Sequence, residues 1–248
     1  TKLKNGKCIN KNTNRVIRAI IPMHIFGHMS DMSKLKKLAS KFKLLIIEDA
    51  AEALGSYYNK KHAGTFGHIG TLSFNGNKII TTGMGGAILT NNKKIYLKAK
   101  HLAATAKAKS KWDYIHDMLG YNYRLPSLNA SIGCSQMKKI KFLIQKKRRL
   151  FKMYKKAFSK NDFLKLVAEH TNYKSNYWLQ TVVLKPQFKD LRKMILDKCY
   201  KNKIYIRPTW KPLHQLNYFK KFPKMNLAKT NSLSLRVLNL PSSSFLSK

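Results

Sequence analysis

Acidic residues are scarce in this chain. Ten Asp and Glu stand against fifty Lys and Arg in 248 residues, a formal net charge of +40. Only eight of the fifty are Arg, and Lys is spread over nearly every segment. Specific nucleic-acid binders usually concentrate their charge and favour Arg, whose guanidinium makes paired bonds to bases and phosphates. We therefore interpret the charge as Lys at exposed positions, and expect only nonspecific polyanion binding at low salt.

Long apolar runs and paired cysteines are also lacking. No stretch approaches the roughly 18 apolar residues needed to cross a bilayer, and residues 1–7 do not lead into the apolar core of a secretory signal. The cysteines Cys8, Cys134 and Cys199 lie far apart and form no Cys-x-x-Cys pair. A cytoplasmic protein with reduced thiols and no membrane partner is the simplest expectation.

The apolar pattern predicts an alternation of strands and helices. Strands are predicted at residues 16–26, 44–47, 69–74 and 86–90. Residues 32–42 predict a helix, with Ser30 or Asp31 as its cap. Strands separated by crossovers favour a largely parallel sheet, whose functional residues gather at the carboxyl ends of the strands. Asp49 and Ser73 fall at such ends.

The character of the chain changes after residue 120. Residues 129–156 are compatible with one long helix. Strands at residues 178–184 and 204–206 then flank a helix at residues 190–202, which predicts a second, smaller domain. The expected division is part of a large domain at residues 1–135, a connecting helix at 136–156 and a small C-terminal domain at 157–248.

Two polar clusters follow predicted strands. Residues 48–52 (EDAAE) hold three of the ten acidic residues and directly follow a buried strand. Downstream, Ser73 and Lys78 are spaced as Ser-x4-Lys in SFNGNK, and the glycine turn TTGMGG follows. An acid at the end of a strand, a Ser-x4-Lys loop and a glycine turn suit a site for pyridoxal 5'-phosphate, PLP.

Several segments, in the right order, resemble the DegT/DnrJ/EryC1/StrS sugar aminotransferases. They are EDAAEALGS at residues 48–56, GTLSFNGNKIITTG at 70–83 and GYNYRL at 120–125. Three segments look closest to one branch of this family. They are SFNGNKIITTG at 73–83, KHLAATAK at 100–107 and RPTWKPLH at 207–214. That branch aminates nucleotide-linked 4-keto-6-deoxy-hexosamines on routes to sugars of the bacillosamine or legionaminic acid type. The resemblance runs from about residue 16 to residue 243.

The resemblance implies a fold as well. We expect an α/β protein with a partial PLP-transferase fold of type I, in which helices flank a largely parallel sheet, and a small C-terminal α/β domain. Family members carry an N-terminal segment with a Gly-Thr phosphate-binding turn and an aromatic residue that covers the cofactor ring. That N-terminal part is expected to be missing here, which leaves the last four strands of a seven-stranded sheet. A fragment of a longer protein is therefore expected.

The resemblance assigns roles to individual residues. Lys78 is expected to bind the PLP aldehyde covalently and to move the α-proton of the substrate. Asp49 would face the pyridine nitrogen, and Glu52 would bond near the phenolic oxygen of the ring. Ser73 would contact the cofactor phosphate, and Asn122 the phosphate of the neighbouring subunit's cofactor. A turn-capping Asp49, an exposed Glu52 and ordinary loop structure at Asn122 remain the structural alternatives.

Substrate contacts are expected at two further residues. Arg124 would support the phosphate contact or meet the nucleotide diphosphate, and His214 would lie in the substrate pocket, although a packed surface histidine is as good an interpretation. His24 and His28 have the spacing H-x3-H, but no acid or Cys completes a ligand set, so no metal site is expected.

The expected activity is transfer of an amino group, with glutamate as donor, to the C4 ketone of a nucleotide-linked 4-keto-6-deoxy sugar. A homodimer with shared active sites is the expectation that the family gives. A non-catalytic remnant of the PLP fold and a cationic polyanion-binding protein are the alternatives. The sequence leaves open the nucleotide, the sugar and its configuration at C4.

Overall fold

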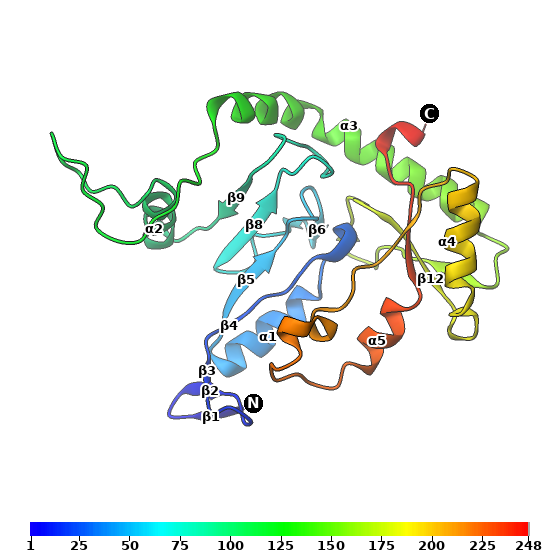
Figure 1. The fold of residues 1–248 in the computed structure, drawn as a ribbon, viewed down its shortest axis with the longest axis horizontal. Helices are drawn as coiled ribbons and strands as arrows, with labels where there is room; N and C mark the ends of the chain where they lie inside the picture. Colours follow the sequence, from blue (N-terminus) through cyan, green and yellow to red (C-terminus); the bar gives the residue numbers. More distant parts are fainter. Residues whose placement is uncertain (248) are drawn as a thin grey trace. The chain divides into compact units, whose positions relative to one another are not determined.

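The computed structural model describes residues 1–247, which group into two compact units. The parallel-sheet unit consists of residues 18–141 and 172–175. The antiparallel-sheet unit consists of residues 1–17, 142–171 and 176–247. Figure 1 shows the path of the chain and the elements of each unit.

The parallel-sheet unit is built on a four-stranded sheet with the order β4–β5–β8–β9. Its strands are β4 (Ala19–Ile20), β5 (Leu45–Asp49), β8 (Ile69–Ser73) and β9 (Gly86–Leu89). β4, β5 and β8 are parallel, whereas β9 runs antiparallel to β8. The sheet is thus largely parallel, and it has the four strands that the resemblance implies.

Helix α1 (Met32–Phe42) makes the crossover between β4 and β5. Asp31 caps it, because its side chain accepts a hydrogen bond from the Lys34 amide at 3.0 Å. Met32 and Ala39 lie on one face of the helix and pack against Ile46 of β5 in a buried cluster. The predicted helix, with Asp31 as one of two candidate caps, is confirmed.

Smaller elements complete this unit. A second sheet has the order β11–β6–β7, formed by β6 (Tyr57–Tyr58), β7 (Lys61–His62) and β11 (Tyr173–Lys174). The remaining helix is α2 (Lys93–Ala103), capped by the Asn92 side chain. The long helix α3 (Ser127–Ala157) contributes its residues up to 141 here and its later residues to the other unit.

The antiparallel-sheet unit has a four-stranded sheet with the order β10–β12–β14–β13. Val182, Leu184 and Leu238 form its buried centre. Its strands are β10 (Leu164–Leu166), β12 (Gln180–Leu184), β13 (Arg207–Pro208) and β14 (Val237–Leu240). Its helices are α4 (Leu191–Lys201) and α5 (Ala228–Ser234). A separate antiparallel ribbon consists of β1 (Lys2–Lys4), β2 (Lys7–Ile9) and β3 (Val16–Ile17).

Two predicted strands are wrong. Residues 16–26 form two short strands, β3 and β4, and the 3-10 turn η1 (Ile25–Gly27). They are not one strand, because β3 pairs with β2 and β4 pairs with β5 in another sheet. Residues 204–206 form no strand. The Ile204 amide instead donates to the Cys199 carbonyl at 2.8 Å, so the chain is still reversing after α4 at this point.

The domain limits predicted near residues 135 and 156 stay predictions.

The remaining 3-10 turns are η2 (Pro186–Phe188), η3 (Leu213–Gln215), η4 (Asn217–Phe219) and η5 (Ser244–Leu246). Within residues 1–247, none of the helices combines the length and the apolar character that crossing a membrane requires.

Lys147 of α3 is a buried lysine inside the antiparallel-sheet unit, with 8% of its surface exposed. Its Nζ donates to the Trp178 carbonyl at 2.8 Å and to the Ser242 carbonyl at 2.7 Å. The Lys147 backbone carbonyl accepts in turn from Gln180 Nε2 at 3.0 Å. Burial lowers the pKa of Lys147 to about 8, because the charged form is less well solvated than in water.

We predict a stability change with pH that depends on this lysine. Between about pH 8 and 10.5 the unfolded chain keeps the proton that the folded chain loses, so the free energy of unfolding rises with pH. The rise due to this group is roughly 3 kcal/mol over that window. Urea unfolding of wild type and Lys147→Met across this range measures it. The variant should lose the rise, and Lys155→Met on the exposed side of α3 should keep it.

Candidate active site

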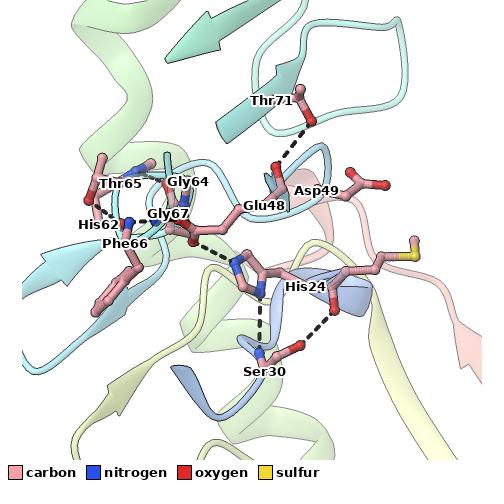
Figure 2. Close-up of polar contacts among 12 residues, drawn as sticks. His24, Ser30, Glu48, Asp49, His62, Gly64, Thr65, Phe66, Gly67 and Thr71 are labelled. Atoms are coloured by element: carbon pink, nitrogen blue, oxygen red, sulfur yellow. Dashed lines mark hydrogen bonds and ion pairs between the residues drawn. The ribbon is translucent and has the colours of Figure 1, made fainter. Parts of the chain in front are cut away.

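Two adjacent carboxylates end strand β5, and they have different surroundings. Glu48 is fully buried, whereas Asp49 is partly exposed. Successive side chains of a strand point to opposite faces, and Figure 2 shows the two carboxylates pointing apart. The Asp49 backbone is fixed, because its amide donates to the Pro22 carbonyl and its carbonyl accepts from the His24 amide, at 2.9 and 3.0 Å.

Four N–H groups surround the Glu48 carboxylate (Figure 2). Oε1 accepts from the amides of Phe66 and Gly67, each at 2.6 Å. Oε2 accepts from the Gly64 amide at 2.9 Å and from His24 Nε2 at 3.0 Å. Burial raises the pKa of Glu48, but the bonds from His24, Gly67 and Gly64 outweigh it, so the pKa is lowered and the group is a carboxylate.

His24 is a neutral histidine with one tautomer. Its Nδ1 accepts from the Ser30 amide at 3.2 Å, so that nitrogen carries no proton. The proton therefore sits on Nε2, which donates to Glu48. This assignment follows from the hydrogen-bond network. The fully buried pair thus holds one negative charge, and that charge belongs to Glu48.

Glu52 lies one turn beyond the end of β5, and it is buried with 6% exposure. Its Oε2 accepts from the backbone amide of Phe26 at 2.7 Å. Phe26 has the left-handed backbone angles φ 57° and ψ 17°, which cost a bulky residue about 1–2 kcal/mol. The turn η1 is therefore held in a strained conformation that aims one amide at Glu52.

Lys78 meets Glu52 across this site. Its Nζ lies 3.8 Å from Glu52 Oε1, and the side chain is 13% exposed. Burial lowers the pKa of Lys78, and the charges of Glu52 and Asp49 oppose that effect without cancelling it. The structure therefore brings together Lys78, Glu52 and Asp49, three of the residues that the sequence predicts to bind the cofactor.

The pKa values of the two ion-pair partners move toward each other. Burial raises the pKa of Glu52, and the Phe26 amide and the charge of Lys78 only partly oppose this rise. Because the pKa of Lys78 falls at the same time, a proton moves between amine and carboxylate at a smaller free-energy cost than in water. A lysine in such surroundings is suited to act as a nucleophile and as a proton carrier.

The segment from Ser73 onward folds back as a tight turn. Ser73 Oγ accepts from the Asn75 amide at 3.3 Å, and the Thr82 amide donates to the Phe74 carbonyl at 2.9 Å. Gly85 has φ +105°, and a Cβ atom there would lie 2.7 Å from Leu125 Cδ1. The positive φ favours glycine at this position of the TTGMGG turn, whereas the flexible Leu125 side chain could move aside.

Asn122 and Arg124 line a cavity of about 990 Å³ in the parallel-sheet unit. Thr71 of β8 and Met84 and Gly85 of the glycine turn line the same cavity. Among the residues described, neither Lys78 nor Asp49 belongs to its lining. The structure thus places Asn122 and Arg124 beside the glycine turn, and their predicted contacts with a cofactor or substrate stay predictions.

His214 belongs to the antiparallel-sheet unit, so its predicted role in a substrate pocket stays a prediction. Its Nε2 bonds Asn231 Oδ1 at 2.7 Å. Within residues 1–247, no three His, Cys, Asp or Glu side chains gather as metal ligands.

Sequence reasoning gave no role to Glu48 and considered His24 only as a metal ligand. The available signal was an acid that directly follows an apolar run, because a carboxylate that becomes buried there needs several donors. The donors themselves lie 16 to 24 residues away, where no local pattern marks them.

Comparisons with known proteins identify the family of this chain. Residues 4–248 match the model of the DegT/DnrJ/EryC1/StrS aminotransferase family. GDP-perosamine synthase of Escherichia coli O157:H7 is 37% identical over 235 residues, which cover 94% of this chain and 62% of that protein. UDP-4-amino-4,6-dideoxy-N-acetyl-beta-L-altrosamine transaminase of Campylobacter jejuni serotype O:23/36 is 31% identical, with coverage of 83% and 55%.

A solved structure of an aminotransferase has a similar fold. PseC of Helicobacter pylori, an aminotransferase involved in the biosynthesis of pseudoaminic acid, superposes with a TM-score of 0.88 at 27% identity. The match covers 95% of this chain and 63% of PseC. The chain thus spans less than two thirds of the length of these relatives. Because the family model matches nearly all of it, the chain belongs to the DegT/DnrJ/EryC1/StrS aminotransferase family.

Proposed function

We propose that this chain carries the lysine site of a PLP-dependent aminotransferase that converts a nucleotide-linked 4-keto-6-deoxy sugar to the 4-amino sugar. The observation that carries the proposal is the half-buried Lys78, held 3.8 Å from Glu52 in a member of this family. The relatives named for perosamine and altrosamine compounds support a nucleotide sugar as the substrate class.

The residues present fit PLP. When bound, PLP supplies an aldehyde that captures amines and a ring that withdraws electrons from the neighbouring carbon. The aldehyde requires an unprotonated amine, and burial lowers the pKa of Lys78 in that direction. The pyridine nitrogen requires a carboxylate, and the partly exposed Asp49 at the end of β5 offers one.

Each residue then has a defined task in the proposed reaction. Lys78 Nζ binds the cofactor and afterwards carries the α-proton of the amino donor. Asp49 keeps a proton on the ring nitrogen, and Glu52 orients Lys78 and bonds near the phenolic oxygen. Ser73 and Asn122 bind phosphate, Asn122 from the neighbouring subunit of a homodimer.

The remaining parts of the proposal concern the two substrates. Arg124 and His214 contact the nucleotide sugar. Glutamate is the proposed donor: it loses its amino group and leaves as 2-oxoglutarate, and the amino group replaces the oxygen at C4 of the sugar. Sugars linked to uridine diphosphate and to guanosine diphosphate are both candidates, because one relative is named for a GDP-sugar and another for a UDP-sugar.

The proposal is tested by following both products. The full-length enzyme that contains this chain, supplied with PLP, glutamate and either a UDP- or a GDP-linked 4-keto-6-deoxy sugar, should yield 2-oxoglutarate and a 4-amino sugar in equal amounts. We predict that Lys78→Ala lowers this turnover by at least about a thousandfold, because it removes both the covalent and the proton-carrying group. Liquid chromatography with mass spectrometry measures both products.

The control for this experiment is Lys37→Ala on the exposed face of α1, which should keep full turnover. Borohydride treatment should fix PLP to the peptide that contains Lys78 in wild type and in the control. If PLP is fixed in the full-length enzyme but neither product forms, the protein binds the cofactor without catalysis and the proposed reaction is wrong. If PLP is fixed to other lysines equally, the lysine assignment is wrong.

A second prediction concerns the acidity of Lys78. The Glu52 charge raises the pKa of Lys78, so Glu52→Gln should lower that pKa further and leave more unprotonated amine at neutral pH. Labelling with a small amine-reactive reagent at several pH values, followed by mass spectrometry of the Lys78 peptide, gives the midpoint. An unchanged midpoint in Glu52→Gln would show that the two groups are not coupled.

A further inference from the structure

We infer that Glu48 is a positioning residue that acts through His24 on the loop of residues 24–28, and so holds the Phe26 amide against Glu52. The inference rests on the proposed function for its catalytic meaning, since Glu52 and Lys78 are the groups it serves. Its structural content can be tested without a cofactor.

The first step is that Glu48 is immobile. The amides of Gly64, Phe66 and Gly67 reach its two oxygens at 2.6 to 2.9 Å. The Gly67 amide belongs to a residue with no room for a side chain, because a Cβ there would lie 2.6 Å from the Ile46 carbonyl oxygen. A carboxylate held by three backbone amides from one loop is a fixed point on β5.

The second step is that His24 connects the fixed Glu48 carboxylate to the loop of residues 24–28. Its ring is fully buried, with Nε2 on Glu48 and Nδ1 on the Ser30 amide (Figure 2). Its backbone amide also donates to the Asp49 carbonyl at 3.0 Å. One residue therefore ties the start of the loop to both carboxylate-bearing residues at the end of β5.

The third step is the short distance along the chain from His24 to Phe26. The far side of the loop is fixed, because the Gly27 carbonyl accepts from Ser56 Oγ at 2.7 Å and from Ser175 Oγ at 2.9 Å. Phe26 between these anchors keeps its left-handed conformation and donates to Glu52 Oε2 at 2.7 Å. Loosening the His24 anchor lets the strained turn relax and withdraw this amide.

The consequence concerns the orientation of Glu52. With Oε2 held by the Phe26 amide, Oε1 is the oxygen that faces Lys78 Nζ, at 3.8 Å. Without that amide the carboxylate loses the 2.7 Å bond that orients Oε1 toward the lysine. Glu48 therefore influences the site of the proposed chemistry without contacting any reacting atom.

A matched pair of variants isolates the bond between His24 and Glu48. In His24→Gln the side-chain NH2 group stands near the position of Nε2 and still donates to Glu48. In His24→Asn the side-chain oxygen stands near the position of Nδ1 and still accepts from Ser30, but the donor to Glu48 is lost. Both variants remove the buried ring, and Asn leaves the larger cavity because its side chain is one methylene shorter than that of Gln.

The measurement is the amide spectrum of protein labelled with ¹⁵N at its twelve Phe residues, recorded without cofactor between pH 5 and 8. Phe26 reports on Glu52, and Phe66 reports on Glu48, since each amide bonds the respective carboxylate. Phe26→Leu and Phe66→Leu identify the two signals. Glu52→Gln should abolish the titration of the Phe26 signal and leave the position of the Phe66 signal unchanged.

We expect His24→Gln to keep both signals near their wild-type positions, with the Phe26 signal still titrating. His24→Asn should keep the Phe66 signal but lose the titration of Phe26. The inference is overturned if both variants behave alike, or if Phe26 titrates normally in His24→Asn. Loss of all Phe signals in His24→Asn would also overturn it, because the bond would then support the whole unit rather than one loop. None of these outcomes depends on whether the chain proves to be an aminotransferase.

Discussion

The buried negative charge of Glu48 is the constraint on which the rest of the parallel-sheet unit depends. A carboxylate in a protein interior is stable only when donors replace its lost water, and here three amides and one histidine do so. Because the amides come from residues 64–67 and the histidine from residue 24, satisfying one side chain fixes two distant loops against β5. The strand end that carries Asp49 is thereby rigid before any ligand arrives.

Burial also accounts for the properties of Lys78. Removal from water disfavours the charged amine and the charged Glu52 alike, while their mutual attraction works in the opposite direction. Burial prevails for both groups, so the pair is drawn toward neutrality. A lysine on an open surface would keep its proton at neutral pH and would be a poor nucleophile. The fold of the loop after β8 therefore lowers the pKa of Lys78, which the residue type alone would not do.

Prediction from the sequence succeeded where the signal was local. The apolar spacing of residues 32–42 and the adjacent Asp31 define α1, and the apolar runs near β5, β8 and β9 define those strands. It failed at residues 16–26 and 204–206, although both segments hold apolar residues with good strand propensity. The first segment passes from one sheet to another, and the second is the turn that follows α4. At residues 16–26 a distant partner decided the outcome, because β4 pairs with β5, whereas at residue 204 a local bond to Cys199 continues the reversal after α4.

The sequence by itself determined the family, the Ser-x4-Lys spacing and the place of Glu48 and Asp49 directly after an apolar run, because motif order and residue spacing are local properties. Only the tertiary structure decided that Glu48 meets His24 and that Glu52 lies between the Phe26 amide and Lys78. These contacts join residues 24 to 26 positions apart, and their energies come from burial and hydrogen-bond geometry. Neither quantity exists until the chain has folded around the buried carboxylates.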